Sequence, residues 1–236
     1  MTEFNRSIML WLLLLMGNAT AFSVNYPKIF GDSWVAAVNH IKEHHEEWQR
    51  EFCLFGVEGQ VAEAVVFPEL IRYSVWKDEI EGAAAWGLYV LRGREGADFS
   101  IGRFQMKPSF AEEVERAWNL SPLAREYGFS FNLQQNSEAR RSRIRRLSTT
   151  QGQCRYLSIF ILLLRERLPQ LRQMPLEQQV RLLATAYNCS FSASWKELQR
   201  LQRERHFHTG VLPWRAPARR YCYADVAVSY FLSNDK

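Results

Sequence analysis

Glycine and proline are scarce in this 236-residue chain, at 12 and 8 residues, and no segment repeats along it. Collagen-like, proline-rich and solenoid proteins are therefore excluded. No run alternates convincingly between apolar and polar residues at period two, so strands are not expected. Hydrophobic residues make up 47% of the chain and aromatic residues 14%, which is enough to bury a core. The sequence predicts an all-α fold.

Several signatures of metal and catalytic sites are also missing. The chain has no CxxC, HExxH, GxSxG, P-loop or dinucleotide fingerprint. His40 and His44 stand at i, i+4 with His45 and Glu46 beside them, a spacing that can bind zinc. A solvated helix face explains these residues more simply, and His206-Phe207-His208 is an equally thin signal. We therefore expect no metal and no cofactor.

The N-terminal segment predicts export. Ile8 to Met16 is an apolar stretch that follows Arg6 and precedes Ala19-Thr20-Ala21, the small-x-small pattern of a signal peptidase site. The stretch is shorter than the ~20 apolar residues of a membrane span. We expect residues 1–21 to be a secretory signal peptide, with an N-terminal anchor helix as the alternative. Residues 22–236 would then form one domain, periplasmic or secreted, without a stable membrane span.

Four cysteines leave two interpretations open. Their even number allows two disulfides in an oxidising compartment, with three possible connectivities. Free cysteines are also common as small buried hydrophobic residues, and a domain of this size does not need cross-links. The four are Cys53, Cys154, Cys189 and Cys222.

The candidate acid is Glu69. Gln60 to Phe67 is apolar almost all round, which predicts a buried helix, and Pro68 predicts a kink or an end. Glu69 should therefore emerge between the core and a cleft. Because desolvation penalises the charged form, a carboxyl held there can serve as an acid near neutral pH. The alternative is an ion pair with Arg72.

Two further helix starts are predicted from capping-box spacing. Ser109 and Glu112 have this spacing, and so do Thr150 and Gln153, which precede a long apolar segment at residues 154–168. That segment is too short to cross a membrane and predicts a central buried helix.

Ser100 to Ser109 (SIGRFQMKPS) and Ala184 to Phe191 (ATAYNCSF) resemble two signatures of lysozyme-like lytic transglycosylases, G-L-M-Q-I-x-P-S and A-Y-N-A-G. Between them, Cys154-Arg155-Tyr156-Leu157 occupies the place of the family's G-x-x-Y-L. Upstream, AVVFPEL is similar to the helix that carries the family's catalytic Glu. The resemblance covers roughly Val61 to Ser190. The matching residues are Gly102, Gln105, Met106, Pro108 and Ser109 in the first signature, and Ala186, Tyr187 and Asn188 in the second.

The resemblance implies a lysozyme-like helical domain that cleaves the glycan strands of peptidoglycan. Glu69 would protonate the glycosidic oxygen and then act as base, while the C6 hydroxyl of the sugar attacks to give a 1,6-anhydromuramoyl end. Gln105 would hydrogen-bond the sugar, and Tyr187 would lean toward Glu69 or the acetamido group. Asn188 would hold backbone in the cleft. Gly102 and Met106 complete the implied substrate-binding set.

The sequence also departs from the family pattern. Leu70 follows Glu69, where the family usually has Ser, and an insertion separates Glu69 from Gln105. Glu79 and Glu81 therefore remain second choices for the acid. Asp98 resembles an acidic residue of goose-type lysozymes and is a possible second carboxylate for hydrolysis, or else a loop cap.

The charge balance is compatible with an anionic cell-wall partner. Lys and Arg number 30 against 25 Asp and Glu, a formal charge of +5. The densest run, five arginines from Arg140 to Arg146, predicts a solvated helix face or a contact for stem-peptide carboxylates; outside the cytoplasm we expect no nucleic acid. The alternatives to transglycosylation are a hydrolytic muramidase, a catalytically weak glycan-binding or envelope-assembly protein, and a basic protein that binds nucleic acid or another polyanion.

Overall fold

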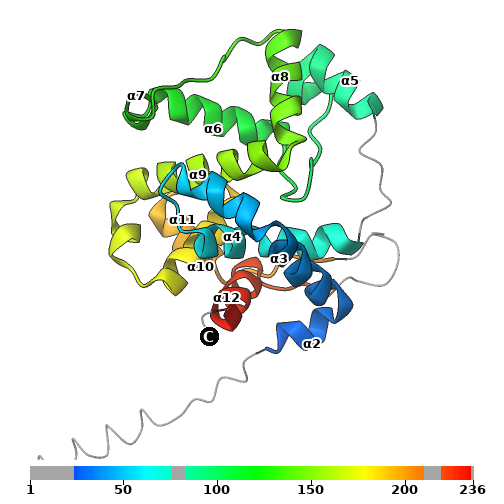
Figure 1. Ribbon diagram of the computed structural model, residues 1–236, viewed down its shortest axis with the longest axis vertical. Helices are drawn as coiled ribbons and strands as arrows, with labels where there is room; N and C mark the ends of the chain where they lie inside the picture. Colours follow the sequence, from blue (N-terminus) through cyan, green and yellow to red (C-terminus); the bar gives the residue numbers. More distant parts are fainter. Residues whose placement is uncertain (1–23, 76–82, 210–218, 235–236) are drawn as a thin grey trace, which may run out of the picture.

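The computed structural model describes residues 24–75, 83–209 and 219–234 (Figure 1). Within these ranges the chain forms helices and two isolated β-bridges, and no strand. The all-α prediction is confirmed. The expected signal peptide at residues 1–21 and the alternative acids Glu79 and Glu81 lie outside the described residues.

A buried helix, α4 (Gly59–Val75), is the centre of one half of the molecule. It packs against α3 (Asp32–Cys53), α10 (Leu176–Cys189) and α12 (Tyr223–Asn234). Every residue from 61 to 70 is buried, as expected for a helix that is apolar almost all round. The helix continues through Pro68, so the alternative in which it ends there is wrong. Glu69 therefore lies inside the helix rather than at its end.

Helix α9 (Thr150–Arg167) lies between the two halves of the molecule (Figure 1). It contacts α3 and α4 on one side, and α6 (Pro108–Leu120) and α8 (Ser137–Leu147) on the other. Its apolar segment is buried, which confirms the prediction of a central helix. The remaining elements are α2 (Tyr26–Phe30), α5 (Ala83–Arg92), α7 (Leu123–Glu126), α11 (Trp195–Leu201) and two 3-10 turns, η1 (Gly93–Glu95) and η2 (Pro169–Gln173).

The first predicted capping box does not form. The N-cap of α6 is Lys107, which makes no side-chain cap hydrogen bond. Ser109 instead donates its backbone N–H and its hydroxyl to the two carboxylate oxygens of Asp98, at 3.0 and 2.9 Å. Glu112 is buried and accepts a hydrogen bond from Tyr89, 2.7 Å away. Its carboxylate is committed to the interior, which explains why it cannot cap the helix.

The second predicted capping box does not form either. The N-cap of α9 is Thr149, whose hydroxyl accepts the Gly152 N–H. Gln153 is buried, and its amide joins the end of α8 to a distant turn: Nε2 donates to the Leu147 carbonyl at 2.7 Å and Oε1 accepts the Phe104 N–H at 2.8 Å. This side chain fixes the turn at residues 101–106 to α9.

The arginine run is not a uniformly solvated face. Arg143 is buried and bonded to Glu115 and Glu112, while Arg146 reaches Glu115 from the partly exposed side. Arg140 donates to backbone carbonyls at the end of α5. The prediction is therefore wrong for three of the five arginines, because nearby carboxylates and carbonyls bind them internally. The other two are exposed.

All four cysteines fall within the described residues and all are free. Cys154 and Cys222 are buried, and Cys53 and Cys189 are exposed. The interpretation as small buried residues thus applies to two of them. Among the described residues, none of the helices has the length and apolar character needed to cross a membrane.

Candidate active site

Glu69 is a residue of α4 that lies close to Tyr223 of α12, and only 4% of its surface is exposed. Its Oε2 accepts a hydrogen bond from Arg72 Nη1 at 2.9 Å, so the predicted ion pair is present. The Arg72 guanidinium also lies over the Phe207 ring, 4.9 Å from its centroid. Phe207 is held by backbone hydrogen bonds to Tyr221. The arginine is thus confined between its carboxylate and an aromatic ring.

Burial raises the pKa of Glu69. The charge of Arg72 and hydrogen bonds from Tyr223 and Arg72 act in the opposite direction, since they stabilise the carboxylate. Desolvation is the largest of these effects, and the net direction is upward. The site therefore favours a carboxyl that keeps its proton to higher pH than an exposed glutamate, the property required of a general acid.

Two tyrosines accompany Glu69. Burial and the charge of Glu69 raise the pKa of Tyr187 on α10 and that of Tyr223 on α12, and Tyr187 raises the pKa of Tyr223 further. Tyr223 donates its hydroxyl to the Val65 carbonyl, one turn before Glu69, at 3.1 Å. Three helices thus bring one carboxyl and two phenols into the same electrostatic environment.

Tyr187 also ties this site to the turn at residues 101–106. Its hydroxyl donates to the Phe104 carbonyl at 2.7 Å, and its ring packs against Phe110 and Phe160. The Phe104 ring also packs against the Trp48 ring on α3, with centroids 4.9 Å apart. The expected approach of Tyr187 to Glu69 is therefore accompanied by a structural role, because its hydroxyl anchors the turn.

The turn needs unusual backbone conformations at two of the predicted site residues. Gly102 has φ 65°, and a Cβ built there would lie 1.7 Å from Gln153 Nε2. Gln105 has φ 51°, which is rare for a residue with a side chain. Its Nε2 donates to the Gly102 carbonyl at 2.9 Å. Bridge hydrogen bonds between Ile101 and Met106 close the turn.

The other predicted residues have different surroundings. Met106 is 2% exposed and packs in the core. The Asn188 amide donates to Cys189 Sγ at 3.7 Å. Asp98 is exposed, and both its oxygens bind Ser109 at the start of α6, which matches the capping interpretation.

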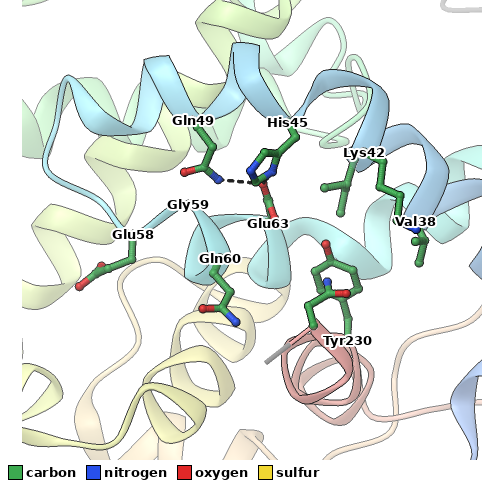
Figure 2. A pocket seen from close by; sticks show the side chains of 11 residues that line it. Val38, Lys42, His45, Gln49, Glu58, Gly59, Gln60, Glu63 and Tyr230 are labelled. Carbon is green, nitrogen blue, oxygen red and sulfur yellow. Dashed lines mark hydrogen bonds and ion pairs between the residues drawn. The ribbon is translucent and has the colours of Figure 1, made fainter. Parts of the chain in front are cut away.

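A second carboxyl, Glu63, lines a pocket of about 920 Å³ on another face of α4 (Figure 2). Its Oε1 accepts from Gln49 Nε2 at 2.9 Å and lies 3.0 Å from His45 Nδ1. Burial raises the pKa of Glu63, while its hydrogen bonds with Gln49, His45 and Tyr230 lower it. Protein groups already bind this carboxylate, and none of the family signatures reaches the pocket.

Comparisons with known proteins add no identification. The chain matches no family model, no curated protein and no solved structure.

Sequence reasoning missed two residues that organise the site. Tyr223 lies far beyond the resembling segment, and only the packing of α12 on α4 brings it to Glu69. Gln153 has the spacing of a cap residue, but its amide bonds Phe104 and Leu147 instead. No local pattern in the sequence encodes either contact.

Proposed function

We propose that this protein cleaves the glycan strands of peptidoglycan by the lytic transglycosylase reaction, within a lysozyme-like fold. The observation that supports the proposal is that Tyr187 lies in the electrostatic environment of Glu69 and also bonds the turn at residues 101–106. The AVVFPEL helix supplies the acid, the AYN segment supplies Tyr187, and the Tyr187 hydroxyl holds the turn that bears Gln105. These are the segments that resemble the family signatures, and they are distant in sequence.

In the proposed reaction Glu69 acts twice. As the acid it transfers its proton to the glycosidic oxygen, and the bond from that oxygen to the anomeric carbon breaks. The C6 hydroxyl of the same sugar then attacks the anomeric carbon and gives its proton to the Glu69 carboxylate. The product is a 1,6-anhydro ring, and the enzyme returns to its protonated state without water or a second carboxylate.

The surroundings of Asp98 support transglycosylation over hydrolysis. An inverting hydrolase needs a second carboxylate to activate water. Asp98, the predicted candidate, has both oxygens bonded to Ser109 and lies 3.8 Å from Lys107 Nζ. A carboxylate occupied in this way is a poor base for water.

The Glu69–Arg72 ion pair favours a second candidate, a protein that binds glycan without cleaving it. An ionised Glu69 cannot donate a proton, so activity requires that burial outweigh the attraction of Arg72. Polyanion binding has less support, since three arginines of the densest run are bound internally. For either glycan function we place the protein in the bacterial envelope or outside the cell.

The test is mass analysis of muropeptides released from purified peptidoglycan. Transglycosylation predicts anhydro ends, lighter by one water than the reducing ends of a muramidase. Glu69→Gln should lower release at least ~100-fold, since general acid–base catalysis contributes about 10²- to 10⁴-fold. Glu63→Gln is the matched control, a buried glutamate of the same helix, and should retain release within about twofold. No release by the wild type would overturn the proposal in favour of binding.

A further inference from the structure

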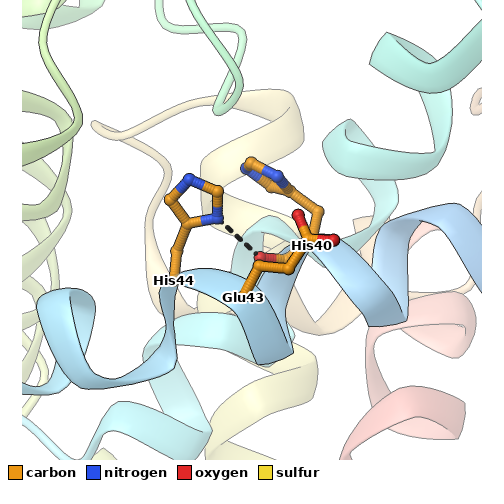
Figure 3. A group of neighbouring side chains, drawn as sticks. All are labelled: His40, Glu43 and His44. Atoms are coloured by element: carbon orange, nitrogen blue, oxygen red, sulfur yellow. Dashed lines mark hydrogen bonds between the residues drawn. The ribbon is translucent and has the colours of Figure 1, made fainter.

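Helix α3 presents three potential metal donors on one face. His40, Glu43 and His44 stand at i, i+3 and i+4, which brings them onto adjacent turns of a helix. One donor atom from each lies within 4.8 Å of the others (Figure 3). His45 and Glu46, which also adjoin these histidines in the sequence, are not part of the group. His45 points toward Glu63, and Glu43 supplies the third donor.

The ring of His44 is already oriented as a ligand would be. Its Nδ1 lies 2.9 Å from the His40 backbone carbonyl. A carbonyl can only accept, so the proton is on Nδ1 and the lone pair is on Nε2. Metal-bound histidines almost always donate their second nitrogen to a carbonyl or carboxylate in this way, which fixes the tautomer and the ring.

Two aromatic rings contact the His40 imidazole. Its ring centroid lies 4.2 Å from that of His44 and 5.7 Å from that of Trp48, and the residue is half-buried. These ring contacts fix the His40 imidazole next to that of His44 on the same helix.

A cavity of about 310 Å³ opens beside the group and gives a bound ion room for further ligands. His40 and Glu43 line it together with Arg103, from the turn at residues 101–106, and Leu70 of α4. Arg103 is the cation that opposes a metal here. Its guanidinium lies 4.4 Å from the Tyr73 ring centroid, and the Glu43 carboxylate offsets part of the added charge.

We propose that His40, Glu43 and His44 form a binding site for a divalent transition-metal ion of the zinc class, with positions left open to solvent. Two imidazoles and one carboxylate form a donor set that zinc uses when it keeps an open position. The site is independent of glycan cleavage and stands whether or not Glu69 is catalytic.

The experiment is calorimetric titration of the full chain with Zn²⁺. The wild type should bind one ion at this site, and His40→Gln or His44→Gln should weaken that binding by roughly tenfold or more, as expected when a ligand of a small site is lost. Glu43→Gln should weaken it by a smaller factor. The matched control is His45→Gln, the adjacent histidine of the same helix, which should leave the affinity within about twofold.

A second measurement needs no variant. Traces of Cu²⁺ should broaden the imidazole NMR signals of His40 and His44 before those of His45, His206 and His208. Zinc affinity that is unchanged in both His40→Gln and His44→Gln would overturn the site and point to the exposed thiols of Cys53 and Cys189. Broadening that begins at any of the other three histidines would overturn it as well.

Discussion

Glu69 and Glu115 are both buried glutamates, but their surroundings differ. Glu115, with no exposed surface, binds Arg143 at 2.6 Å and Arg146 at 2.7 Å and also accepts a short hydrogen bond from Tyr156. Glu69 has one arginine, Arg72, whose side chain is 22% exposed.

The difference shows how the same residue type is fitted to two tasks. Two guanidiniums compensate the buried charge of Glu115, and the Glu115 carboxylate in turn raises the pKa of Arg143 against the effect of burial. Glu69 receives less compensation, and desolvation raises its pKa. A fully bonded carboxylate stabilises a fold, whereas one with a raised pKa in a site of interacting groups is a candidate for chemistry.

The largest expected effect on stability is at Glu115. Glu115→Gln removes a charge that faces Arg143, which is 1% exposed and retains only the 3.2 Å contact to Glu112 among its ion pairs. Removing one partner of a buried ion pair costs about 3–5 kcal/mol, so the free energy of unfolding should fall by about that amount in urea denaturation. Glu113→Gln, a partly exposed neighbour on α6, is the control and should change it by less than about 0.5 kcal/mol. Equal effects of the two changes would contradict the assigned role of Glu115.

A substitution in the turn at residues 101–106 should impair glycan cleavage at the Glu69 site and leave the ion pairs of Glu115 in place. Gly102→Ala places a Cβ at φ 65° and 1.7 Å from Gln153 Nε2, so both backbone strain and a displaced side chain are expected. Strain at such a position costs about 1–3 kcal/mol, and glycan cleavage should fall because the Phe104 anchor moves. Gly128→Ala has a similar φ of 70° with nothing within 4 Å, and it isolates strain from the clash. If Gly102→Ala loses no more activity than Gly128→Ala, the clash with Gln153 does not explain the loss.

Tyr223→Phe should shift the pH dependence of cleavage. The Tyr223 hydroxyl shares its one proton between the Val65 carbonyl and the Glu69 carboxylate, which stabilises the charged form of Glu69, so its loss should raise the pKa of Glu69 further. The alkaline limb of kcat/KM should therefore move to higher pH, because Glu69 keeps its proton further up the pH scale. Tyr127→Phe, whose hydroxyl binds the Phe55 carbonyl, is the control and should leave the limb in place. A downward shift in Tyr223→Phe would refute this contribution.

The smallest effect concerns the stability of Glu69→Gln. A native pKa above the ordinary 4.5 means that the folded state binds the proton more tightly than the unfolded state. Wild-type stability should therefore fall as pH rises from about 4.5 through the raised pKa, whereas glutamine does not titrate. At neutral pH the variant should unfold within about 1 kcal/mol of the wild type, and its relative stability should improve with rising pH. An opposite trend in urea midpoints would show that the Arg72 ion pair dominates.

Local pattern predicted the elements well where burial and periodicity agree. The apolar runs that became α4 and α9 were identified because a helix that is apolar all round has to be buried. Glu69 was identified for the same reason, since a glutamate directly after such a run lies beside the core. The Arg72 ion pair followed from its i+3 spacing and is observed.

Long-range pairing was beyond the sequence. Ser109–Glu112 and Thr150–Gln153 have capping spacing, but Glu112 and Gln153 form tertiary hydrogen bonds instead. The arginine run likewise predicts a solvated face from its sequence alone, whereas in the structure Arg143 forms an ion pair with Glu115. Such contacts depend on how helices pack, and the local spacing of residues carries no information about them.

The acid role of Glu69 is tested most directly by comparing Glu69→Gln with Glu115→Gln in one assay, the rate of anhydro-muropeptide release per folded molecule. We expect Glu69→Gln to keep a near wild-type unfolding midpoint and to lose at least ~100-fold in rate. Glu115→Gln should do the reverse, with a lowered midpoint and a rate per folded molecule close to that of the wild type. A Glu69→Gln protein that is folded and still releases anhydro ends at the wild-type rate would contradict the role of Glu69 as the acid.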